Sequence, residues 1–328
     1  MTEPIRWGVL GASKFARESM GPAIHAAPGH VLAALATRDT AKAAPFAGLA
    51  PGLRVFEDYD ALLADPAIDA VYVPLPHAIH VEWGLRALAA GKPVLVEKPA
   101  GMAVVEVEAL IAARDRTGLV ATEAFMIAHH PQWAFVAELL TEDAVGPLRH
   151  VDGVFTYDNS SAPGNIRNLA AMGGGALPDI GVYTIGGTRL ATGLEPERIV
   201  QADLDWAAGC DTVARVAARF PGFSATWLNS MRMAKHQRMT FHGQAGLIHL
   251  EAPFNPPGYA EARVTWWGTD GVRHERRWPG VDHYVLQVLA FGRALRDGAA
   301  LPWTLEDARG TQAVIDAIYA AAGGRQAA

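Results

Sequence analysis

Lys98 is the residue of this sequence whose position most directly suggests chemistry. It follows the apolar run Val94–Val96 and Glu97, and it directly precedes Pro99. A strand fixes the origin of the side chain that ends it, and proline restricts the backbone of the residue before it. We therefore expect Lys98 to be catalytic. The alternative is that Lys98 forms a loop salt bridge to an acid such as Glu97.

A second pattern with chemical meaning lies near the start of the chain. The apolar run Ile5–Leu10 leads into Gly11-Ala12-Ser13-Lys14-Phe15-Ala16, a G-x-G-x-x-G/A fingerprint with Ser and Ala at its second and third glycine positions. Gly11 would make the tight turn, and a small Ser13 would let the backbone approach a pyrophosphate at the helix N-terminus. We expect the dinucleotide to contact Gly11, Ala12, Ser13, Lys14 and Phe15; a plain strand-to-helix turn is the alternative.

The end of the second strand distinguishes between nicotinamide cofactors. NAD-binding chains place an acid there, whereas this strand ends in Ala36-Thr37-Arg38. A guanidinium binds phosphate through a planar fork of donors, and a hydroxyl adds one more hydrogen bond. Thr37 and Arg38 therefore favour NADP, with NAD possible. The alternative is a solvated Arg38 beside Asp39.

Ligands bind at the carboxyl ends of the strands of open α/β sheets. Val71–Pro76 contains one such end and Val94–Lys98 contains another. We expect the residues of these two ends that contact the cofactor to be Leu75, Pro76, His80, Glu97 and Lys98.

These residues must be positioned by a sheet, and residues 5 to about 124 have its pattern. Short apolar runs typical of buried parallel strands alternate with Ala-rich helical segments, which predicts right-handed βαβ units and a doubly wound α/β domain over 1–124. The clearest strands are Ile5–Leu10, Val31–Ala36, Ala70–Val73, Val94–Val96 and Val120–Thr122, with helices at about 14–27, 40–47, 58–64, 78–90 and 103–116.

Residues 125–328 have a different pattern and form the second predicted domain. Alternating segments there indicate antiparallel strands with one solvent-facing side, and two helices close the chain at about 283–297 and 304–321. The alternating segments are Val213–Phe220, Ala225–Asn229, Met239–His242 and Arg263–Trp267.

Composition excludes several classes of protein. The chain has 328 residues, 50% of them hydrophobic and 19% charged, which suits a packed globular protein of two domains. A net charge of −6 without a basic stripe argues against nucleic acid. The single Cys210 excludes an internal disulfide, and Glu3 and Pro4 stand where a signal peptide needs basic residues, so we expect a cytoplasmic protein without a membrane partner.

Several motifs together resemble the Gfo/Idh/MocA oxidoreductases, a family that includes glucose-fructose oxidoreductase and dihydrodiol and xylose dehydrogenases. The resemblance covers nearly the whole chain in order. It rests on the fingerprint at Gly11, on Glu97-Lys98-Pro99, on Glu123-Ala124-Phe125-Met126 with His130-Pro131-Gln132, and on Gly173-Gly174-Gly175-Ala176-Leu177-Pro178-Asp179-Ile180-Gly181-Val182-Tyr183.

The resemblance implies a Rossmann domain followed by an α+β domain with a large open, mostly antiparallel sheet, with the substrate between them above the nicotinamide. It implies that Lys98 lies near nicotinamide and substrate, that Glu97 shapes the turn, and that Asp179 and Tyr183 project from one helix. The spacing i, i+4 gives these last two a shared helical face. The alternative for Tyr183 is a core ring with a satisfied hydroxyl.

These roles predict hydride transfer between NADP, or NAD, and a carbinol or carbonyl carbon of a sugar or polyol. Tyr183 is the expected acid/base; because free tyrosine titrates near ~10, a neighbouring ammonium such as Lys98 would be needed to favour its phenolate. Asp179 and His130 are next in line for that role, and both are expected, with Tyr183, to contact the substrate. Asn165, Arg167 and Asn168 are candidates to hydrogen-bond the substrate hydroxyls, with a solvated loop as the alternative.

Departures from the family leave the substrate open. Ile127-Ala128 stand where the dihydrodiol and xylose branch has Tyr-Arg, and His77 stands where many members have Asn. Dihydrodiols or dicarbonyls are therefore alternative substrates. A non-catalytic NADP sensor and a methyltransferase are rival classes, but neither needs both Lys98 and Tyr183. We expect no metal, since adjacent His129 and His130 in a strand would point to opposite faces.

The alternating segments also predict an assembly. Their Trp and other apolar side chains are placed where an open sheet face would expose them, and monomers seldom expose much more than ~600 Å² of apolar surface. We expect a homodimer, or a dimer of dimers, joined sheet to sheet by an isologous contact. The alternative is that these aromatic side chains are buried in the domain's own core.

Overall fold

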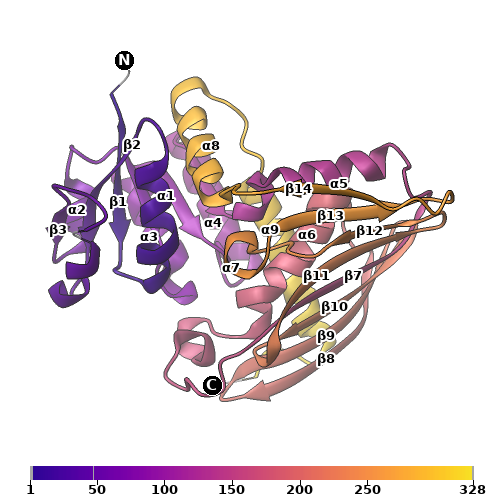
Figure 1. Ribbon diagram of the computed structural model, residues 1–328. Helices are drawn as coiled ribbons and strands as arrows, with labels where there is room; N and C mark the ends of the chain where they lie inside the picture. The colour runs from indigo at the N-terminus through magenta and orange to yellow at the C-terminus, as the bar shows by residue number, and fades with distance from the viewer. Residues whose placement is uncertain (1–2, 47, 327–328) are drawn as a thin grey trace. The chain divides into compact units, whose positions relative to one another are not determined.

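The computed structural model describes residues 3–46 and 48–326, and the chain divides into two compact units (Figure 1). The first unit comprises Met1–His129 and Asp282–Arg309, and the second comprises His130–Val281 and Gly310–Ala328. The predicted domains, 1–124 and 125–328, differ from these units at residues 125–129 and 282–309. The difference arises because the sequence pattern cannot show that a late helix returns to the first core.

The first unit contains a parallel sheet in the order β3-β2-β1-β4-β5-β6, which confirms the predicted doubly wound fold. Most residues of its central strands are buried, because helices cover both faces of such a sheet. The strands are β1 Ile5–Leu10, β2 His30–Ala36, β3 Arg54–Phe56, β4 Ala70–Val73, β5 Val94–Glu97 and β6 Ala121–Ala124.

The helices of the first unit largely follow the sequence pattern. Gly118, with φ of +67°, ends α4, and Asp282 caps α8 by accepting from the Tyr284 amide at 2.8 Å. These helices are α1 Gly21–Ala26, which continues a π-helical turn over Ala16–Met20, then α2 Tyr59–Ala64, α3 His80–Ala89, α4 Val104–Thr117 and α8 His283–Asp297.

The predicted helix at 40–47 is wrong over the described residues. The structure has two short 3₁₀ turns there, Thr40–Lys42 and Ala44–Phe46. Pro45 lacks the amide hydrogen that a continuing helix needs, so the segment breaks. Ala47, which the prediction included, lies outside the described residues.

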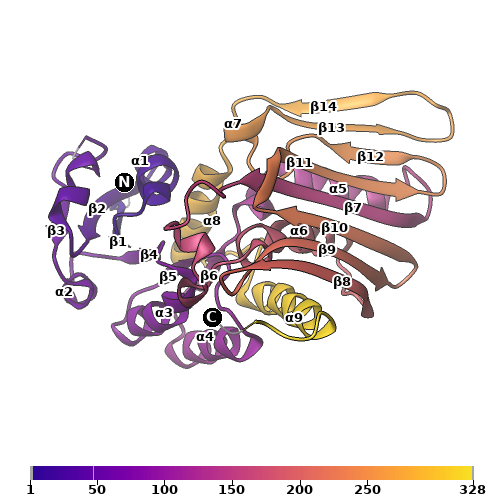
Figure 2. The same cartoon turned by 90° about the horizontal axis from the view of Figure 1, so that it is seen from below.

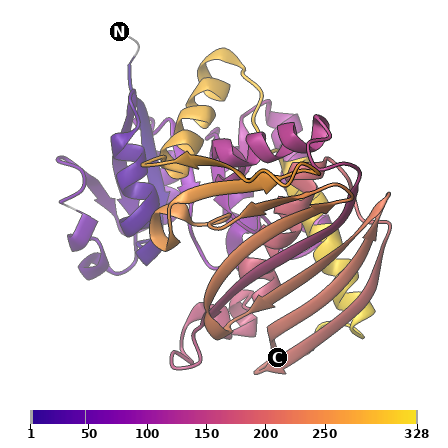
Figure 3. The same cartoon turned by 45° about the vertical axis from the view of Figure 1, so that its right-hand side comes forward.

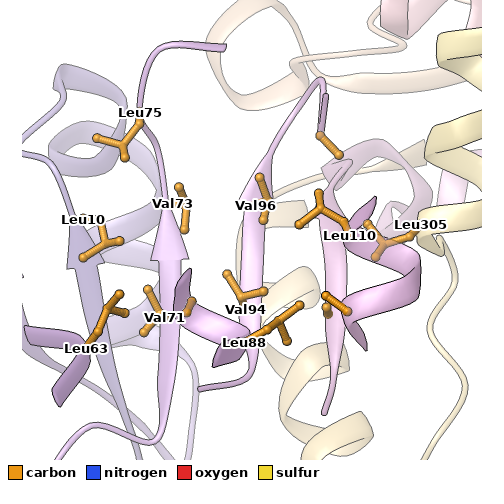
Figure 4. Close-up of a cluster of buried hydrophobic side chains, with 14 of the residues drawn as sticks. Leu10, Leu63, Val71, Val73, Leu75, Leu88, Val94, Val96, Leu110 and Leu305 are labelled. Atoms are coloured by element: carbon orange, nitrogen blue, oxygen red, sulfur yellow. The ribbon is translucent and has the colours of Figure 1, made fainter. Parts of the chain in front are cut away.

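Two apolar clusters form the core of the first unit, one on each face of the sheet. Figure 4 shows the first, in which Leu10, Val71 and Val96 pack with Leu305 from the late segment. The second contains Val288 and Phe291 of α8. Each fully buried side chain of this kind contributes roughly 1.5–3 kcal/mol, which explains why residues 282–309 belong to this unit.

The second unit contains an eight-stranded sheet in the order β14-β13-β12-β11-β7-β10-β9-β8 (Figure 2). It is antiparallel as predicted except that β7 and β10 pair in parallel. Its strands are β7 Leu148–Asp158, β8 Arg198–Ala207, β9 Cys210–Phe220, β10 Phe223–Ser230, β11 Arg232–Gly243, β12 Leu247–Leu250, β13 Ala262–Trp267 and β14 His274–Trp278.

One face of this sheet packs against helices of the second unit. Trp227 Nε1 donates to Thr188 Oγ1 of α6 at 3.0 Å, and Trp266 meets Phe135 of α5 edge-on at 5.2 Å. The helices are α5 Pro131–Thr141, α6 Val182–Thr192 and α7 Pro256–Tyr259, together with α9 Leu305–Ala321, within which the unit boundary falls.

The opposite face, whose strands are seen in Figure 3, carries ion pairs where the sequence predicted apolar side chains. Arg215 pairs there with Asp203 and Asp205, and Arg238 pairs with Asp152. The prediction was wrong because the alternation places Trp227 and Trp266 on the helix-covered face, which leaves the intervening polar residues outside.

Across residues 3–46 and 48–326, none of the helices is long and apolar enough to cross a bilayer.

Candidate active site

The turn after β1 has the geometry that a dinucleotide fingerprint requires. Gly11 has φ of +97°, a conformation that favours glycine, and a Cβ atom there would lie 2.8 Å from Leu75 Cδ2, so that side chain would also have to shift. Ser13 Oγ accepts from the Ala16 amide at 3.0 Å and so caps the first helical turn. Ala12 and Ser13 are partly exposed, so their backbone is accessible to an anion at this helix N-terminus.

The other fingerprint residues lie on the first helical turn. Lys14 is exposed and its Nζ lies 3.8 Å from Glu18. The Phe15 ring meets the Tyr284 ring of α8 edge-on at 5.5 Å. Phe15 therefore supports the turn by packing, and Lys14 remains accessible to a ligand phosphate.

Thr37 and Arg38 end β2 with opposite exposures. Thr37 is buried, and its Oγ1 accepts from the Asp39 amide at 3.2 Å. Arg38 is exposed and forms no ion pair with any residue in the described part of the chain, because Asp39 lies near Lys42 instead. A guanidinium without an internal partner suits a 2′-phosphate, so this end of β2 fits NADP.

Glu97 shapes the turn that carries Lys98. One of its carboxylate oxygens accepts from the Tyr72 hydroxyl at 2.6 Å, and the other accepts from the Lys98 amide at 3.2 Å. Lys98 is 9% exposed, and the Lys98–Pro99 peptide bond is cis. Leu75, which is buried, and Pro76, which is partly exposed, follow the neighbouring strand β4.

His80 does not lie where a cofactor could touch its ring. Its side chain is fully buried, with Nδ1 at 2.8 Å from the Pro99 carbonyl oxygen and Nε2 at 2.7 Å from the Leu75 carbonyl oxygen. Its ring therefore links the loops after β4 and β5 rather than presenting itself to a ligand.

Asp179 and Tyr183 lie in the second unit, on a helix whose first turn is not regular. Leu177–Gly181 forms a π-helical turn that continues into α6, so the predicted α-helical i, i+4 geometry does not extend over both residues. The Tyr183 side chain is buried against the rings of Phe155 and Phe254, whose centroids both lie 5.6 Å from its own.

The Asp179 carboxylate is held by two neighbours. Tyr157 donates its hydroxyl to Oδ2 at 2.6 Å, and Arg167 Nε lies 2.9 Å from Oδ1. Burial and the Asp179 charge raise the pKa of Tyr157, so this tyrosine stays a donor. Asp179 chiefly raises the pKa of Arg167, and Tyr183 also contributes to this rise. Arg167 is thus a cation within electrostatic reach of Tyr183, a stabilising role that the sequence prediction gave to Lys98.

Two further predicted substrate residues, Asn165 and His130, cap local helical segments. The Asn165 side chain accepts from the Arg167 amide at 3.0 Å and caps a 3₁₀ turn. His130 caps α5, since its Nδ1 accepts from the Gln132 amide at 3.1 Å, and burial lowers the pKa of His130 to about 4. The described residues contain no group of three or more His, Cys, Asp or Glu side chains placed to hold a metal ion.

Sequence reasoning missed three residues that support the site, of which Tyr157 is half-buried and Asp211 and Glu123 are buried. Tyr157 holds Asp179, Asp211 accepts from the Leu177 amide at 2.7 Å, and Glu123 accepts from the Ala100 amide at 2.8 Å. Tyr157 and Asp211 lie in strand segments without a recognisable motif. Glu123 belongs to a motif that the sequence analysis named, but the motif alone did not indicate the function of this residue.

Comparisons with known proteins identify the family of the chain. An oxidoreductase family with an NAD-binding Rossmann fold matches residues 5–125, and the GFO/IDH/MocA C-terminal domain matches residues 133–249. The chain is 34% identical over 96% of its length to a dTDP-3,4-didehydro-2,6-dideoxy-alpha-D-glucose 3-reductase of Actinomadura kijaniata, covering 95% of that protein.

Two further similarities extend over whole chains. A D-xylose 1-dehydrogenase (NADP(+)) of Haloferax volcanii is 31% identical, with 96% of this chain and 97% of that protein covered. The crystal structure of a 3-ketoreductase from Actinomadura kijaniata in complex with NADP and TDP-benzene superposes with a TM-score of 0.89 at 33% identity, covering 98% of both chains. This chain belongs to the GFO/IDH/MocA oxidoreductase family and is an enzyme with that family's NAD-binding Rossmann domain.

Proposed function

We propose that this enzyme prefers NADP and transfers hydride between the nicotinamide and a carbinol or carbonyl carbon of a sugar or related polyol. The observation that carries the substrate class is the similarity, over more than nine-tenths of this chain, to a sugar 3-reductase and to a xylose dehydrogenase. The first unit would bind the nucleotide and the second unit the substrate.

The NADP preference is supported by the end of β2. Arg38 is exposed and has no internal ion-pair partner among the described residues, while Gly11 and the capped helix beyond it can receive a pyrophosphate. Two of the relatives named above, the xylose dehydrogenase and the 3-ketoreductase, are described with NADP. The cofactor, when bound, supplies the nicotinamide C4 that gives or accepts hydride.

Lys98 and Tyr183 are the proposed catalytic residues. In the reducing direction the Tyr183 hydroxyl gives its proton to the substrate oxygen as the carbonyl carbon gains hydride. In the oxidising direction the same oxygen takes the hydroxyl proton as the carbon loses hydride. Lys98 would hydrogen-bond to the substrate oxygen and stabilise the negative charge that develops there.

The other predicted substrate residues have proposed roles that follow from their hydrogen bonds and ion pairs. Asp179 forms an ion pair with Arg167, whose positive charge lies within electrostatic reach of Tyr183. We propose that Asp179 and Arg167 act on Tyr183, and that Asn165 and His130 act by holding the backbone around them.

A substrate panel tests this function. Absorbance at the reduced-nicotinamide band is followed with purified enzyme, NADP or NADPH, and four substrate classes: free sugars and polyols, nucleotide-linked keto sugars, dihydrodiols, and dicarbonyls. Turnover on a sugar class with NADP, at least about tenfold above the other classes, supports the proposal. Turnover only on dihydrodiols or dicarbonyls, or cofactor binding without any turnover, contradicts it.

We also propose a homodimer joined through the outer face of the eight-stranded sheet, and a reducing, cytoplasmic location. The dimer is supported by the breadth of this face, over which no described helix of the second unit lies (Figure 3). The location is supported by the single, buried Cys210, and fractionation of the source cells would test it.

A further inference from the structure

One peptide group in the first unit is held from both sides by buried titratable side chains. The group joins Pro99 and Ala100, directly after Lys98. His80 Nδ1 lies 2.8 Å from its carbonyl oxygen, and its amide hydrogen is donated to Glu123 Oε1 at 2.8 Å. The position of this peptide group is therefore fixed by two side chains outside its own loop.

His80 connects this peptide group to the preceding strand end. The ring is fully buried, and Nε2 lies 2.7 Å from the Leu75 carbonyl oxygen. Burial lowers the pKa of His80 to about 4, with a smaller contribution from the Lys98 charge, although the two carbonyl contacts act in the opposite direction. The charged and titratable neighbours of the ring are thus Lys98 and His77, whose ring centroid lies 5.6 Å away.

A neutral imidazole donates from only one nitrogen, so His80 can satisfy only one of its two carbonyl oxygens. A negative charge on Glu123 would polarise the Pro99–Ala100 peptide and make the Pro99 oxygen the stronger acceptor. This selects the ring form with the proton on Nδ1, which is the form that holds the peptide.

Glu123 connects the same peptide group to the next strand. It ends β6 with a side chain that is 5% exposed, and its second oxygen accepts from Trp303 Nε1 at 2.8 Å. Burial raises the pKa of Glu123 to about 7; the charge of Glu97 also raises it, while the two donors and the charge of Lys98 lower it. Glu123 therefore changes charge within the working range of an enzyme.

We propose that His80 and Glu123 are positioning residues that hold the Lys98 segment in place through the Pro99–Ala100 peptide group. The arrangement crosses the ends of β4, β5 and β6, which are neighbours in the sheet. Its hydrogen bonds run from His80 through the peptide group to Glu123 and on to Trp303, while the other ring nitrogen of His80 lies against the Leu75 carbonyl oxygen. The catalytic consequence of this inference rests on the proposed role of Lys98.

Protonation of Glu123 would loosen this arrangement. A carboxylate accepts from both the Ala100 and Trp303 donors, whereas a protonated carboxyl presents a hydroxyl hydrogen to one of them and loses that hydrogen bond. The Lys98 segment is then held best above the pKa of Glu123, and kcat/KM of the wild type relative to Glu123→Gln rises with pH through about 7.

The first test observes Lys98 directly, in the protein without cofactor. The chain has five lysines, so labelling with lysine that carries ¹³C at Cε gives few signals, and Lys98→Arg identifies the one from Lys98. The expected wild-type result is a step in this chemical shift near pH 7 that Glu123→Gln abolishes. A step of the same size in Glu123→Gln would overturn the proposal.

The second test uses two substitutions of His80, each of which retains the contact of one ring nitrogen and removes that of the other. The amide of asparagine can replace Nδ1, and the amide of glutamine can replace Nε2. His80→Asn keeps the link to Pro99, so its kcat/KM should stay within about threefold of wild type. His80→Gln can donate only to the Leu75 carbonyl oxygen and should lose about tenfold to a hundredfold, which corresponds to the cost of leaving a buried hydrogen bond unmade. Equal loss in both variants, or a greater loss in His80→Asn, would overturn the proposal.

Thr122→Val is the matched control for Glu123→Gln. Thr122 is also buried on β6, and its Oγ1 donates to the Trp303 carbonyl oxygen at 2.7 Å. This variant should have a lower Tm but should keep the step in the Lys98 chemical shift and the pH profile of kcat/KM. Loss of the step in Thr122→Val would show that any weakening of this region abolishes it, and would overturn the proposal. If Lys98→Ala retains turnover while the step still depends on Glu123, the proposed function fails and the positioning role stands.

Discussion

At the scale of single residues, the cofactor assignment rests on Arg38. It is exposed, follows the buried Thr37, and has no ion-pair partner among the described residues. Arg38→Ala should weaken NADP binding by at least about tenfold and leave NAD binding almost unchanged, because only NADP carries the 2′-phosphate.

Titration of intrinsic tryptophan fluorescence with each nucleotide measures both affinities. Lys42→Ala, which removes a neighbouring exposed cation, is the control and should alter neither affinity by much. Equal weakening of NADP and NAD in Arg38→Ala would remove the basis for the 2′-phosphate role.

The sequence predicted residues whose chemistry is tied to a local motif. Gly11 follows a strand and opens a helix, so its positive φ could be anticipated, and Lys98 could be placed at a strand end. The partners of Asp179 could not be anticipated, since Tyr157 and Arg167 reach it from 22 and 12 positions away along the chain. Such contacts depend on tertiary packing rather than on spacing.

At the scale of elements, strand β6 has a charge-dependent stability. Burial raises the pKa of Glu123 from its ordinary 4.5 to about 7, so the folded state binds this proton more tightly than the unfolded state does. The stabilisation that comes from the proton is complete below about pH 4.5 and is lost as the pH rises to about 7.

Denaturant unfolding of wild type and Glu123→Gln at several pH values measures this effect. Relative to the variant, the wild type should lose about 3 kcal/mol of unfolding free energy between pH 4.5 and pH 7, an order-of-magnitude value at about 1.4 kcal/mol for each unit of pKa. All other groups titrate in both proteins, so their contributions to the unfolding free energy cancel in the difference between wild type and variant. A difference that does not depend on pH would show that Glu123 keeps its ordinary pKa.

Periodicity predicted most of the elements but not their long-range arrangement. Helices α4 and α8 lie close to their predicted bounds because Gly118 and Asp282 are strong end signals. The parallel pairing of β7 with β10 and the return of α8 to the first core were not predictable. Both depend on which buried surfaces meet, and a single sequence does not encode that as a local pattern.

At the scale of the whole molecule, the outer face of the eight-stranded sheet is charged, so a dimer formed through it should be sensitive to salt. Arg215, Arg238 and Arg263 each pair with acids on this face, so an interface there would be rich in ion pairs rather than apolar. Salt screens such pairs, with a Debye length of about 10 Å at 0.1 M and about 3 Å at 1 M.

Light scattering at micromolar concentration should therefore give twice the 34.9 kDa chain mass, or four times that mass for a dimer of dimers, at low salt. Molar salt should shift the population towards smaller species, and Arg238→Ala should have the same effect at low salt. A mass of one chain at every concentration and salt level would rule out the sheet-mediated dimer.

The proposed function predicts that this enzyme transfers hydride to a sugar carbon, with Lys98 and Tyr183 acting on the substrate oxygen. Incubation with NADPH deuterated at its transferable position and a nucleotide-linked keto sugar, followed by mass spectrometry, detects that transfer. With the wild type we expect one deuterium on the new carbinol carbon. With Lys98→Ala and with Tyr183→Phe we expect at least about a hundredfold slower incorporation, although both variants still bind NADPH. Deuterium incorporation at the wild-type rate in either variant would show that the substituted residue is not catalytic.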